Sequence, residues 1–139
     1  MNENIRMHKR LVRNGVSESV LKRFERELEC LAQIDGQGFD PDEAALIVRI
    51  VGDIPERVPM APFEALWAYA SDFLSACIMI AVADGRYSVE QARHVSTLAS
   101  RLGWSAYQLS RIEHDTMVRL EKAGWSRMDP DQLFGMRPE

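Results

Sequence analysis

The sequence predicts an all-α protein: a single-domain bundle of about six to seven helices that contains an internal helix–turn–helix duplication. Three observations predict it. Apolar residues recur at helical spacing along most of the chain, and no segment shows sustained strand alternation. Capping residues and glycines divide the chain into helix-length segments. An Asp-Gly turn occurs twice, at Asp35-Gly36 and Asp84-Gly85, and each turn leads into a new helix.

Six main helices and a short tail account for the length of the chain. We divide it into an N-terminal helix (1–15), a helical domain (16–124) and a C-terminal tail (125–139) with room for one short helical turn near 130–134. The 139 residues are enough for one domain with its own core. The expected helices cover residues 3–13, 17–34, 40–54, 62–83, 88–102 and 105–123.

Polar residues explain where several helices begin. Ser17 is placed to cap the second helix, and Asp40 is placed to cap the third with Pro41 in its first position. Ser88 and Ser105 precede the last two helices, and a glutamine follows each of them at the spacing of a capping box. Glycines and prolines then end the helices.

The apolar stripes predict which side of each helix faces the core. The helix over 62–83 is apolar all round in its last turns, so we expect it to lie at the centre of the bundle. The expected inward-facing residues, helix by helix, are Ile5, His8 and Val12; Val20, Phe24, Leu28, Leu31 and Ala32; Ala44, Ile47, Val48, Val51 and Ile54; Phe63, Leu66, Trp67, Ala70, Phe73, Leu74, Cys77, Ile78 and Ala81; Val89, Ala92, Val95, Leu98, Ala99 and Leu102; and Leu109, Ile112, Thr116, Leu120 and Ala123.

Composition indicates a soluble cytoplasmic protein. Charged residues make up 27% and hydrophobic residues 46%, which excludes a disordered chain, and a net charge of −4 does not favour a nucleic-acid partner. The start of the chain has no secretory signal, and the apolar stretch 74–83 is about half the ~20 residues that span a bilayer. Cys30 and Cys77 are expected to be buried thiols in a reducing compartment.

The acidic residues are concentrated in the middle of the chain. Residues 31–90 contain three Lys or Arg against ten Asp or Glu, whereas the flanking segments 1–30 and 91–139 have slightly more basic than acidic residues. Both Asp-Gly turns lie in this acidic middle. Such a region suits a cation or a basic surface as partner, and a plain solvated acidic face is the alternative interpretation.

The two turns belong to an internal repeat. The segment LAQIDGQGFDPDEAALIVRIV (31–51) aligns with IAVADGRYSVEQARHVSTLA (80–99). Each contains an apolar helix end, Asp-Gly, a short loop, a capping residue and an acidic first turn of an amphipathic helix. The first unit gathers the carboxylates of Asp35, Asp40, Asp42 and Glu43, and the second those of Asp84 and Glu90.

Clusters of oxygen ligands suit hard divalent cations such as calcium, magnesium or manganese. Two other interpretations stay open. Asp-Gly is an ordinary turn pair, because the aspartate bonds nearby backbone groups and glycine supplies the unusual conformation. Acidic residues in a first helical turn also interact favourably with the helix dipole. The spacing differs from that of a calcium loop, so a standard EF-hand is excluded.

The run IAVADGRYSVEQARHVSTLASRLGWS resembles the signature of the TerB-like domain of tellurite-resistance proteins. In that family an apolar helix ends in Ala-Asp-Gly, and a capped helix with an early glutamate ends in Leu-Gly. The resemblance covers roughly residues 20–123 by helix order, although the specific match is confined to the two turns. It implies an all-α fold with an internal duplication, and an accessory role in a bacterial tellurite or metal-stress system. Protein partners are also implied, at the cytoplasmic membrane or in co-chaperones.

The same resemblance implies a divalent metal ion as cofactor. Carried over by position, Asp84 matches the turn aspartate, Asp35 its counterpart in the first unit, and Glu43 the boxed glutamate. The second unit departs, because Gln91 occupies the boxed position and the nearest carboxylate, Glu90, lies one residue earlier, about 100° around the helix. The implied metal ligands are therefore Asp35, Glu43, Asp84 and Glu90, and the first turn is expected to bind an ion better.

Two other classes of function are alternatives to this one. The first is a metal-independent protein-interaction module that docks a partner through the acidic middle or the basic first helix. The second is an enzyme, which ranks last because the sequence contains no phosphate loop, dinucleotide fingerprint or evident nucleophile–base pair. The three histidines, His8, His94 and His114, are isolated from cysteines and from one another, and are expected to be surface or boundary residues. The oligomeric state stays open.

Overall fold

The computed structural model describes residues 3–34, 41–82 and 87–122, and in residues 3–6 the backbone alone. These residues form helices α1 (Glu3–Arg13), α2 (Glu18–Ala32), α3 (Pro41–Val51), η1 (Phe63–Tyr69, a 3₁₀ helix), α4 (Ala70–Ala81), α5 (Val89–Arg101) and α6 (Ala106–Lys122). Within the described ranges there is no strand. The predicted all-α bundle of about six to seven helices is confirmed.

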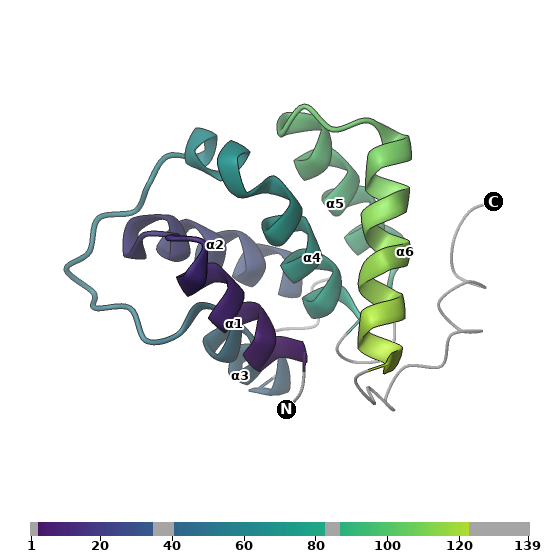
Figure 1. The fold of residues 1–139 in the computed structure, drawn as a ribbon. Coiled ribbons are helices and arrows are strands. Elements are labelled where there is room, and N and C mark those ends of the chain that lie inside the picture. Colours follow the sequence, from purple (N-terminus) through teal and green to yellow (C-terminus); the bar gives the residue numbers. More distant parts are fainter. Residues whose placement is uncertain (1–2, 35–40, 83–86, 123–139) are drawn as a thin grey trace.

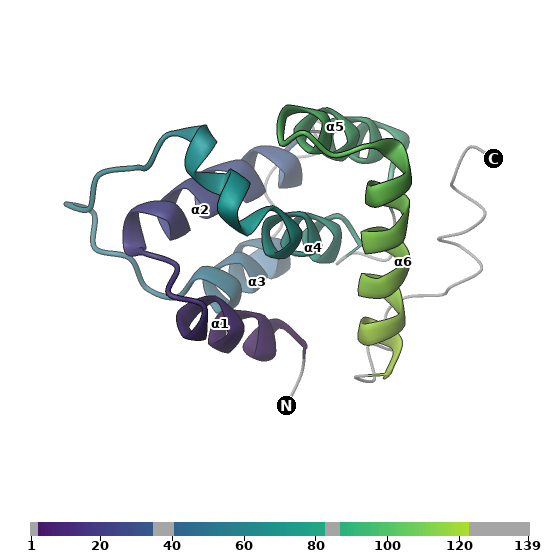
Figure 2. The same ribbon diagram turned by 45° about the horizontal axis from the view of Figure 1, so that its top comes forward.

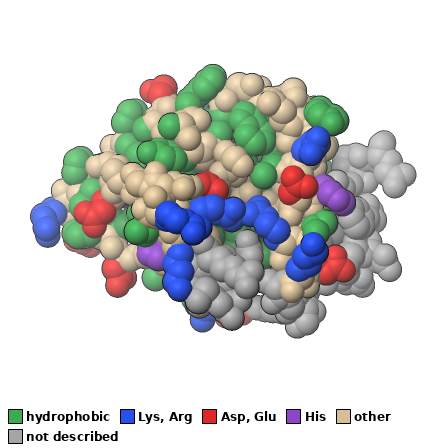
Figure 3. All heavy atoms as spheres, viewed as in Figure 1, with side chains coloured by type: hydrophobic (Ala, Val, Ile, Leu, Met, Phe, Trp, Pro, Cys, Tyr) green, Lys and Arg blue, Asp and Glu red, His purple; other side chains and the backbone are tan. Residues whose placement is uncertain are grey.

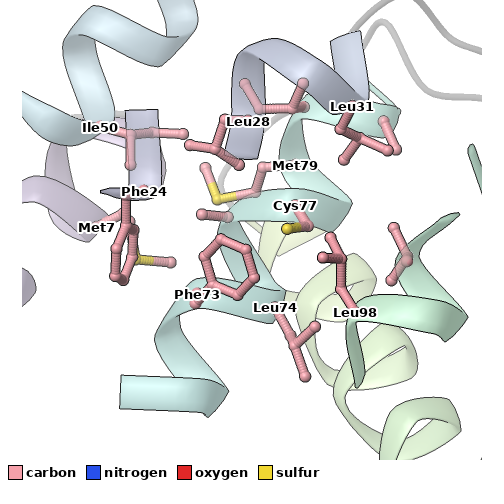
Figure 4. Close-up of a cluster of buried hydrophobic side chains, with 14 of the residues drawn as sticks. Met7, Phe24, Leu28, Leu31, Ile50, Phe73, Leu74, Cys77, Met79 and Leu98 are labelled. Carbon is pink, nitrogen blue, oxygen red and sulfur yellow. The ribbon is translucent and has the colours of Figure 1, made fainter. Parts of the chain in front are cut away.

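Helix α4 lies at the centre of the bundle (Figures 1 and 2). It contacts α1, α2 and α3 on one side and α5 and α6 on the other, and the residues from Phe73 to Val82 are all buried. Figure 4 shows Phe73 of α4 facing Phe24 of α2 and Met7 of α1. The central position predicted for this apolar segment is therefore confirmed. The two repeat units correspond to the contacting pairs α2–α3 and α4–α5.

The predicted caps that fall on described residues are present. The Ser17 hydroxyl accepts a hydrogen bond from the Val20 N–H at 3.4 Å. Ser88 and Gln91 form a reciprocal capping box at the start of α5. Ser105 and Gln108 make the same pair of bonds before α6, at 2.8 and 3.1 Å. Asp40 lies outside the described residues.

The inward faces of α1 and α3 differ from those predicted. In α1 the buried residues are Met7 and Leu11, whereas Val12 is 58% exposed. In α3, Leu46 and Ile50 join Ile47 and Val51 in the core, and Val48 is 49% exposed. Both helices carry apolar residues on two adjacent faces, so the spacing of their apolar residues alone is compatible with either face being turned toward the core. The contacts of α1 with α3 and α4 determine which face is buried.

The segment predicted as one helix over 62–83 is divided in two, and this changes the place of Trp67. The 3₁₀ turns of η1 repeat every three residues, so Phe63 and Leu66 both point inward while Trp67 turns outward and is 55% exposed. Its ring packs on the turn between α5 and α6, where a Cβ on Gly103 would lie 2.8 Å from it. The prediction of Trp67 as a core residue is wrong. Val89, also predicted to face inward, is 49% exposed at the start of α5.

The two cysteines differ in environment. Cys77 is buried in α4, and burial raises the pKa of its thiol, because the charged thiolate is disfavoured away from water. Cys30 is exposed on α2, so its predicted burial is wrong. It lies between Leu28 and Leu31, which fill the inner face of that helix and leave Cys30 on the outer one.

One helical stretch in the described ranges, Phe63–Ala81, is long and apolar enough by composition to cross a membrane. Its most apolar window has a mean hydropathy of 1.3 and is 61% buried inside the bundle. This stretch is η1 and the central helix α4, and core helices of this kind have the same composition. The apolar residues are thus accounted for by packing within the fold.

Candidate binding groove along helix α6

The four predicted metal ligands have different placements. Asp35 and Asp84 lie outside the described residues. Glu43 is 5% exposed in the first turn of α3, and Glu90 is exposed in the first turn of α5. The described part of the chain holds no group of three or more His, Cys, Asp or Glu residues that could bind a metal ion. The predicted ligand set is therefore neither assembled nor tested by the described residues.

In the second repeat unit, the residue at the capping-box position, Gln91, caps the N-terminus of α5. The side-chain oxygen of Gln91 accepts the Ser88 backbone N–H at 3.2 Å, and the Ser88 hydroxyl accepts the Gln91 N–H at 3.1 Å. Gln91 is 2% exposed, whereas the neighbouring Glu90 points to solvent. Gln91 thus has a local role, which is to close the N-terminus of α5.

A groove runs along one side of α6, and its larger part faces α1 and α4. It consists of two adjoining hollows of about 500 and 290 Å³, and both are lined by Ile112 and Asp115 of α6. The larger hollow is bounded by residues of α1, α4 and α6, including Arg10, Asp72 and Arg119. We call this the basic end. The smaller hollow, lined by Trp104, Tyr107 and Arg111 among others, is called the aromatic end.

Buried hydroxyls fix the floor of the basic end. The hydroxyl oxygens of Ser75 on α4 and Thr116 on α6 are 3.0 Å apart, and both residues are at most 2% exposed. The Arg119 Nη2 donates to Ser75 Oγ at 3.1 Å and to Thr116 Oγ1 at 3.3 Å. These bonds join α6 to the central helix and hold the Arg119 guanidinium in one place.

Helix α1 forms the opposite wall of the basic end. The Arg10 Nε lies 3.5 Å from Asp72 Oδ1, and the Asn14 amide donates to Asp72 Oδ2 at 3.2 Å. The Asp72 carboxylate on α4 is thus paired with groups from α1, and its side chain is only 15% exposed. Arg10 and Arg119 therefore stand on two walls of one hollow, each with hydrogen-bonding or ionic partners within the protein.

The aromatic end is more open. Tyr107 is 70% exposed, and its hydroxyl accepts a bond from Arg111 Nη1 at 3.4 Å. Trp104 is half-buried and packs against the core on one side, so its other side is available to the hollow. A pair of aromatic residues next to an arginine is typical of protein-binding surfaces.

Helix α6 is also held from the start of α5. The buried Tyr87 donates its hydroxyl hydrogen to the Glu113 carboxylate at 2.8 Å. Figure 3 shows Lys and Arg side chains gathered in a band across the face that contains α1 and α6. The groove therefore combines a fixed framework with a concentration of positive charge, in a chain whose net charge is −4.

This groove could not be predicted from the sequence. The sequence pattern predicts only a basic first helix, a core position for Thr116 and a surface or boundary position for His114. One sequence feature could have indicated it. Along α6, polar, apolar and charged side chains alternate on one face at helical spacing, at Gln108, Ile112, Asp115 and Arg119. The exposed Tyr107 is a second such signal.

Comparisons of the chain with protein-family models, with curated proteins and with solved structures found no match. The TerB-like family therefore stays a prediction that depends on the two turn motifs.

Proposed function

We propose that this chain is a non-enzymatic protein-interaction module, an accessory protein of the TerB-like kind, that binds a segment of a partner protein in the groove along α6. The observation that carries the proposal is the groove itself. Its larger hollow is bounded by α1, α4 and α6 and lined by Arg10 and Arg119, and its smaller hollow is lined by the half-buried Trp104 and the exposed Tyr107. Trp, Tyr and Arg are the residues most enriched where proteins bind one another.

The framework of the groove favours binding. Ser75, Thr116 and Arg119 form one bonded set, and Arg10 is paired with Asp72, so the walls have little freedom to lose when a partner is bound. Pre-organised surfaces of this kind bind more tightly because the entropy cost of ordering them is small.

The chemistry of the same residues favours binding over catalysis. An activated serine or threonine needs a neighbouring base that removes its proton. The Ser75 and Thr116 hydroxyls instead pair with each other and receive hydrogen bonds from Arg119, whose guanidinium stays protonated and cannot act as that base. Their role is to hold α6 against α4.

Selection from a random peptide library tests this function. We expect the immobilised full chain to enrich peptides in the presence of a chelator, because the groove needs no metal. Tyr107→Glu should weaken their binding by about tenfold or more, since it places a charge in the aromatic end. The matched control is Val48→Glu, which changes another exposed apolar residue, on α3, that lines neither hollow. Failure to enrich any peptide, or equal binding by Tyr107→Glu, contradicts the proposal.

A divalent cation at the first Asp-Gly turn is a second candidate function, and the carboxylates gathered in the first repeat unit, Asp35, Asp40, Asp42 and Glu43, favour it. Oxygen ligands of this kind suit hard divalent cations. We propose calcium, magnesium or manganese held by Asp35 and Glu43. The second turn is a weaker site, because Gln91 is engaged in capping and Glu90 is exposed.

Thermal unfolding at millimolar cation tests the metal site. Binding to the folded state alone stabilises by about 2.7 kcal/mol when the ion is at 100 times its Kd, so the Tm should rise. Asp35→Asn should abolish this rise, whereas Asp84→Asn, the matched control at the second turn, should keep most of it. A wild-type Tm that does not change with any of the three cations contradicts the site. An equal rise of the Tm in the Asp35→Asn variant contradicts it as well.

A further inference from the structure

We propose that the groove selects an acidic segment of a partner protein that carries one large apolar anchor residue. The anchor occupies the aromatic end, and carboxylates of the segment pair with the arginines of the basic end. This inference deepens the proposed function and rests on it. It adds the chemistry of the partner and the order of its residues.

Charge is the first argument. The protein is acidic overall, with a net charge of −4, yet the two hollows are lined by three arginines, Arg10, Arg111 and Arg119, against the two aspartates Asp72 and Asp115. The Arg10–Asp72 ion pair cancels its own charge, which leaves Arg111 and Arg119 against Asp115. The groove therefore carries a small excess of positive charge on an acidic molecule, which favours an acidic segment over a basic one.

The aromatic end supplies the anchor site. Its hollow of about 290 Å³ is at the lower limit of ligand pockets, which run from about 300 to 1,000 Å³, so it suits one side chain rather than a whole cofactor. Trp104 and the exposed Tyr107 flank it, and a leucine or phenylalanine placed there would bury apolar surface against both. Arg111 lies at its edge and can pair with a carboxylate next to the anchor.

The spacing of the two ends sets the length of the segment. Tyr107 and Arg119 are twelve residues apart on α6, which is about 18 Å along the helix axis. An extended peptide covers that distance in about five or six residues. The exposed Asp115 lines both hollows between these ends and disfavours a carboxylate at the middle of the segment. The expected order is therefore an anchor with a carboxylate beside it, a few non-acidic residues, and then one or more further carboxylates.

Fluorescence anisotropy with four labelled synthetic peptides of equal length tests the inference on the full chain. The reference peptide has one Phe anchor followed by a Glu, then a neutral centre and an Asp-Glu end. The others replace the acids by lysines, the anchor by serine, or the neutral centre by aspartates. We expect the reference to bind at least about tenfold more tightly than any other, and to weaken as salt is raised.

Variants assign the contacts. Arg111→Glu should weaken the reference peptide and improve the lysine peptide. The substitution is safe for folding because Arg111 is exposed and its side chain donates a hydrogen bond to the exposed Tyr107. Arg119→Gln should reduce the salt dependence of binding. Tyr107→Ser should affect peptides that carry the anchor and spare the serine peptide. Arg93→Glu on α5, an exposed arginine outside both hollows, is the matched control and should change nothing.

The outcomes separate this inference from the function beneath it. If the lysine peptide binds as well as the reference while Tyr107→Glu still abolishes library binding, the acidic partner is wrong and the interaction groove stands. If library selection enriches nothing, both fail. If the reference peptide binds the full-length double variant Leu133→Ser/Phe134→Ser more tightly than it binds the unchanged protein, the occupant of the groove is the chain's own C-terminal segment instead. Self-association that Tyr107→Glu removes would assign it to a second copy.

Discussion

Replacing Phe73 by alanine is expected to lower the free energy of unfolding by about 3–5 kcal/mol, the range for large buried aromatic residues. Phe73 is fully buried in α4, and its ring meets that of Phe24 edge-on, with centroids 5.2 Å apart and an interplanar angle of 78°. The substitution removes this contact and leaves a cavity between α4 and α2, which rigid neighbours fill only in part (Figure 4).

Urea unfolding followed by circular dichroism measures this loss. Tyr107→Ala is the control, because Tyr107 is 70% exposed and surface substitutions usually change stability by less than about 0.5 kcal/mol. A decrease below about 1 kcal/mol for Phe73→Ala would show that the core is packed differently from Figure 4. An unchanged m-value would indicate that the two variants unfold to similar ensembles.

The same substitution bears on the groove. Phe73 lies between Asp72, on the wall of the basic end, and Ser75, on its floor, in the same turns of α4. A shift of α4 toward the cavity would move Ser75 relative to Thr116 and Arg119. Core packing and the geometry of the proposed binding surface are therefore linked through one helix.

Local chemistry explains why most of the fold could be predicted. Ser88 and Gln91 define the start of α5 by bonds within four residues, and Ser105 and Gln108 do the same for α6. The uniformly apolar end of α4 has one stable location in a small bundle, which is the centre. Features of this kind depend on neighbours along the chain, so the sequence contains all the information they need.

The buried face of each helix was harder to predict, because it depends on neighbours in space and not on neighbours along the chain. Val12 follows His8 at the same helical spacing as Leu11 follows Met7, and only the positions of α3 and α4 decide that Leu11 is buried and Val12 is exposed. The prediction placed Trp67 in the core because a continuous α-helix repeats about every 3.6 residues. In the 3₁₀ helix η1 the inward positions repeat every 3 residues, and Trp67 falls outside them.

The groove could not be predicted for the same reason on a larger scale. Its walls come from α1, α4 and α6, whose contributing residues lie more than forty positions apart, such as Ser75 and Thr116. Each residue has an ordinary interpretation when it is considered alone. The predicted acidic turns are the opposite case, because their pattern is local and visible in the sequence, while Asp35 and Asp84 lie outside the described residues.

Replacing Gly52 by alanine is expected to destabilise the protein more than replacing Gly15, although both glycines have nearly the same backbone conformation, with φ of +77° and +76°. An L-residue in this left-handed region costs about 1–2 kcal/mol at either position. At Gly15 an added Cβ would meet nothing within 4 Å, whereas at Gly52 it would lie 2.7 Å from the His8 ring. That ring can move only by giving up the hydrogen bond between His8 Nδ1 and the Ile50 carbonyl, at 2.9 Å.

The extra cost at Gly52 should be about 1 kcal/mol or more, the scale of overpacking and of a lost hydrogen bond. Urea unfolding of both variants measures the difference, and the double variant His8→Ala/Gly52→Ala isolates its cause, because removing the ring should cancel much of the extra penalty in a double-mutant cycle. Equal losses at the two glycines would show that the His8 contact does not hold α1 in place. Since α1 carries Arg10 into the basic end, a loosened α1 in Gly52→Ala should also weaken binding of the acidic reference peptide more than Gly15→Ala does.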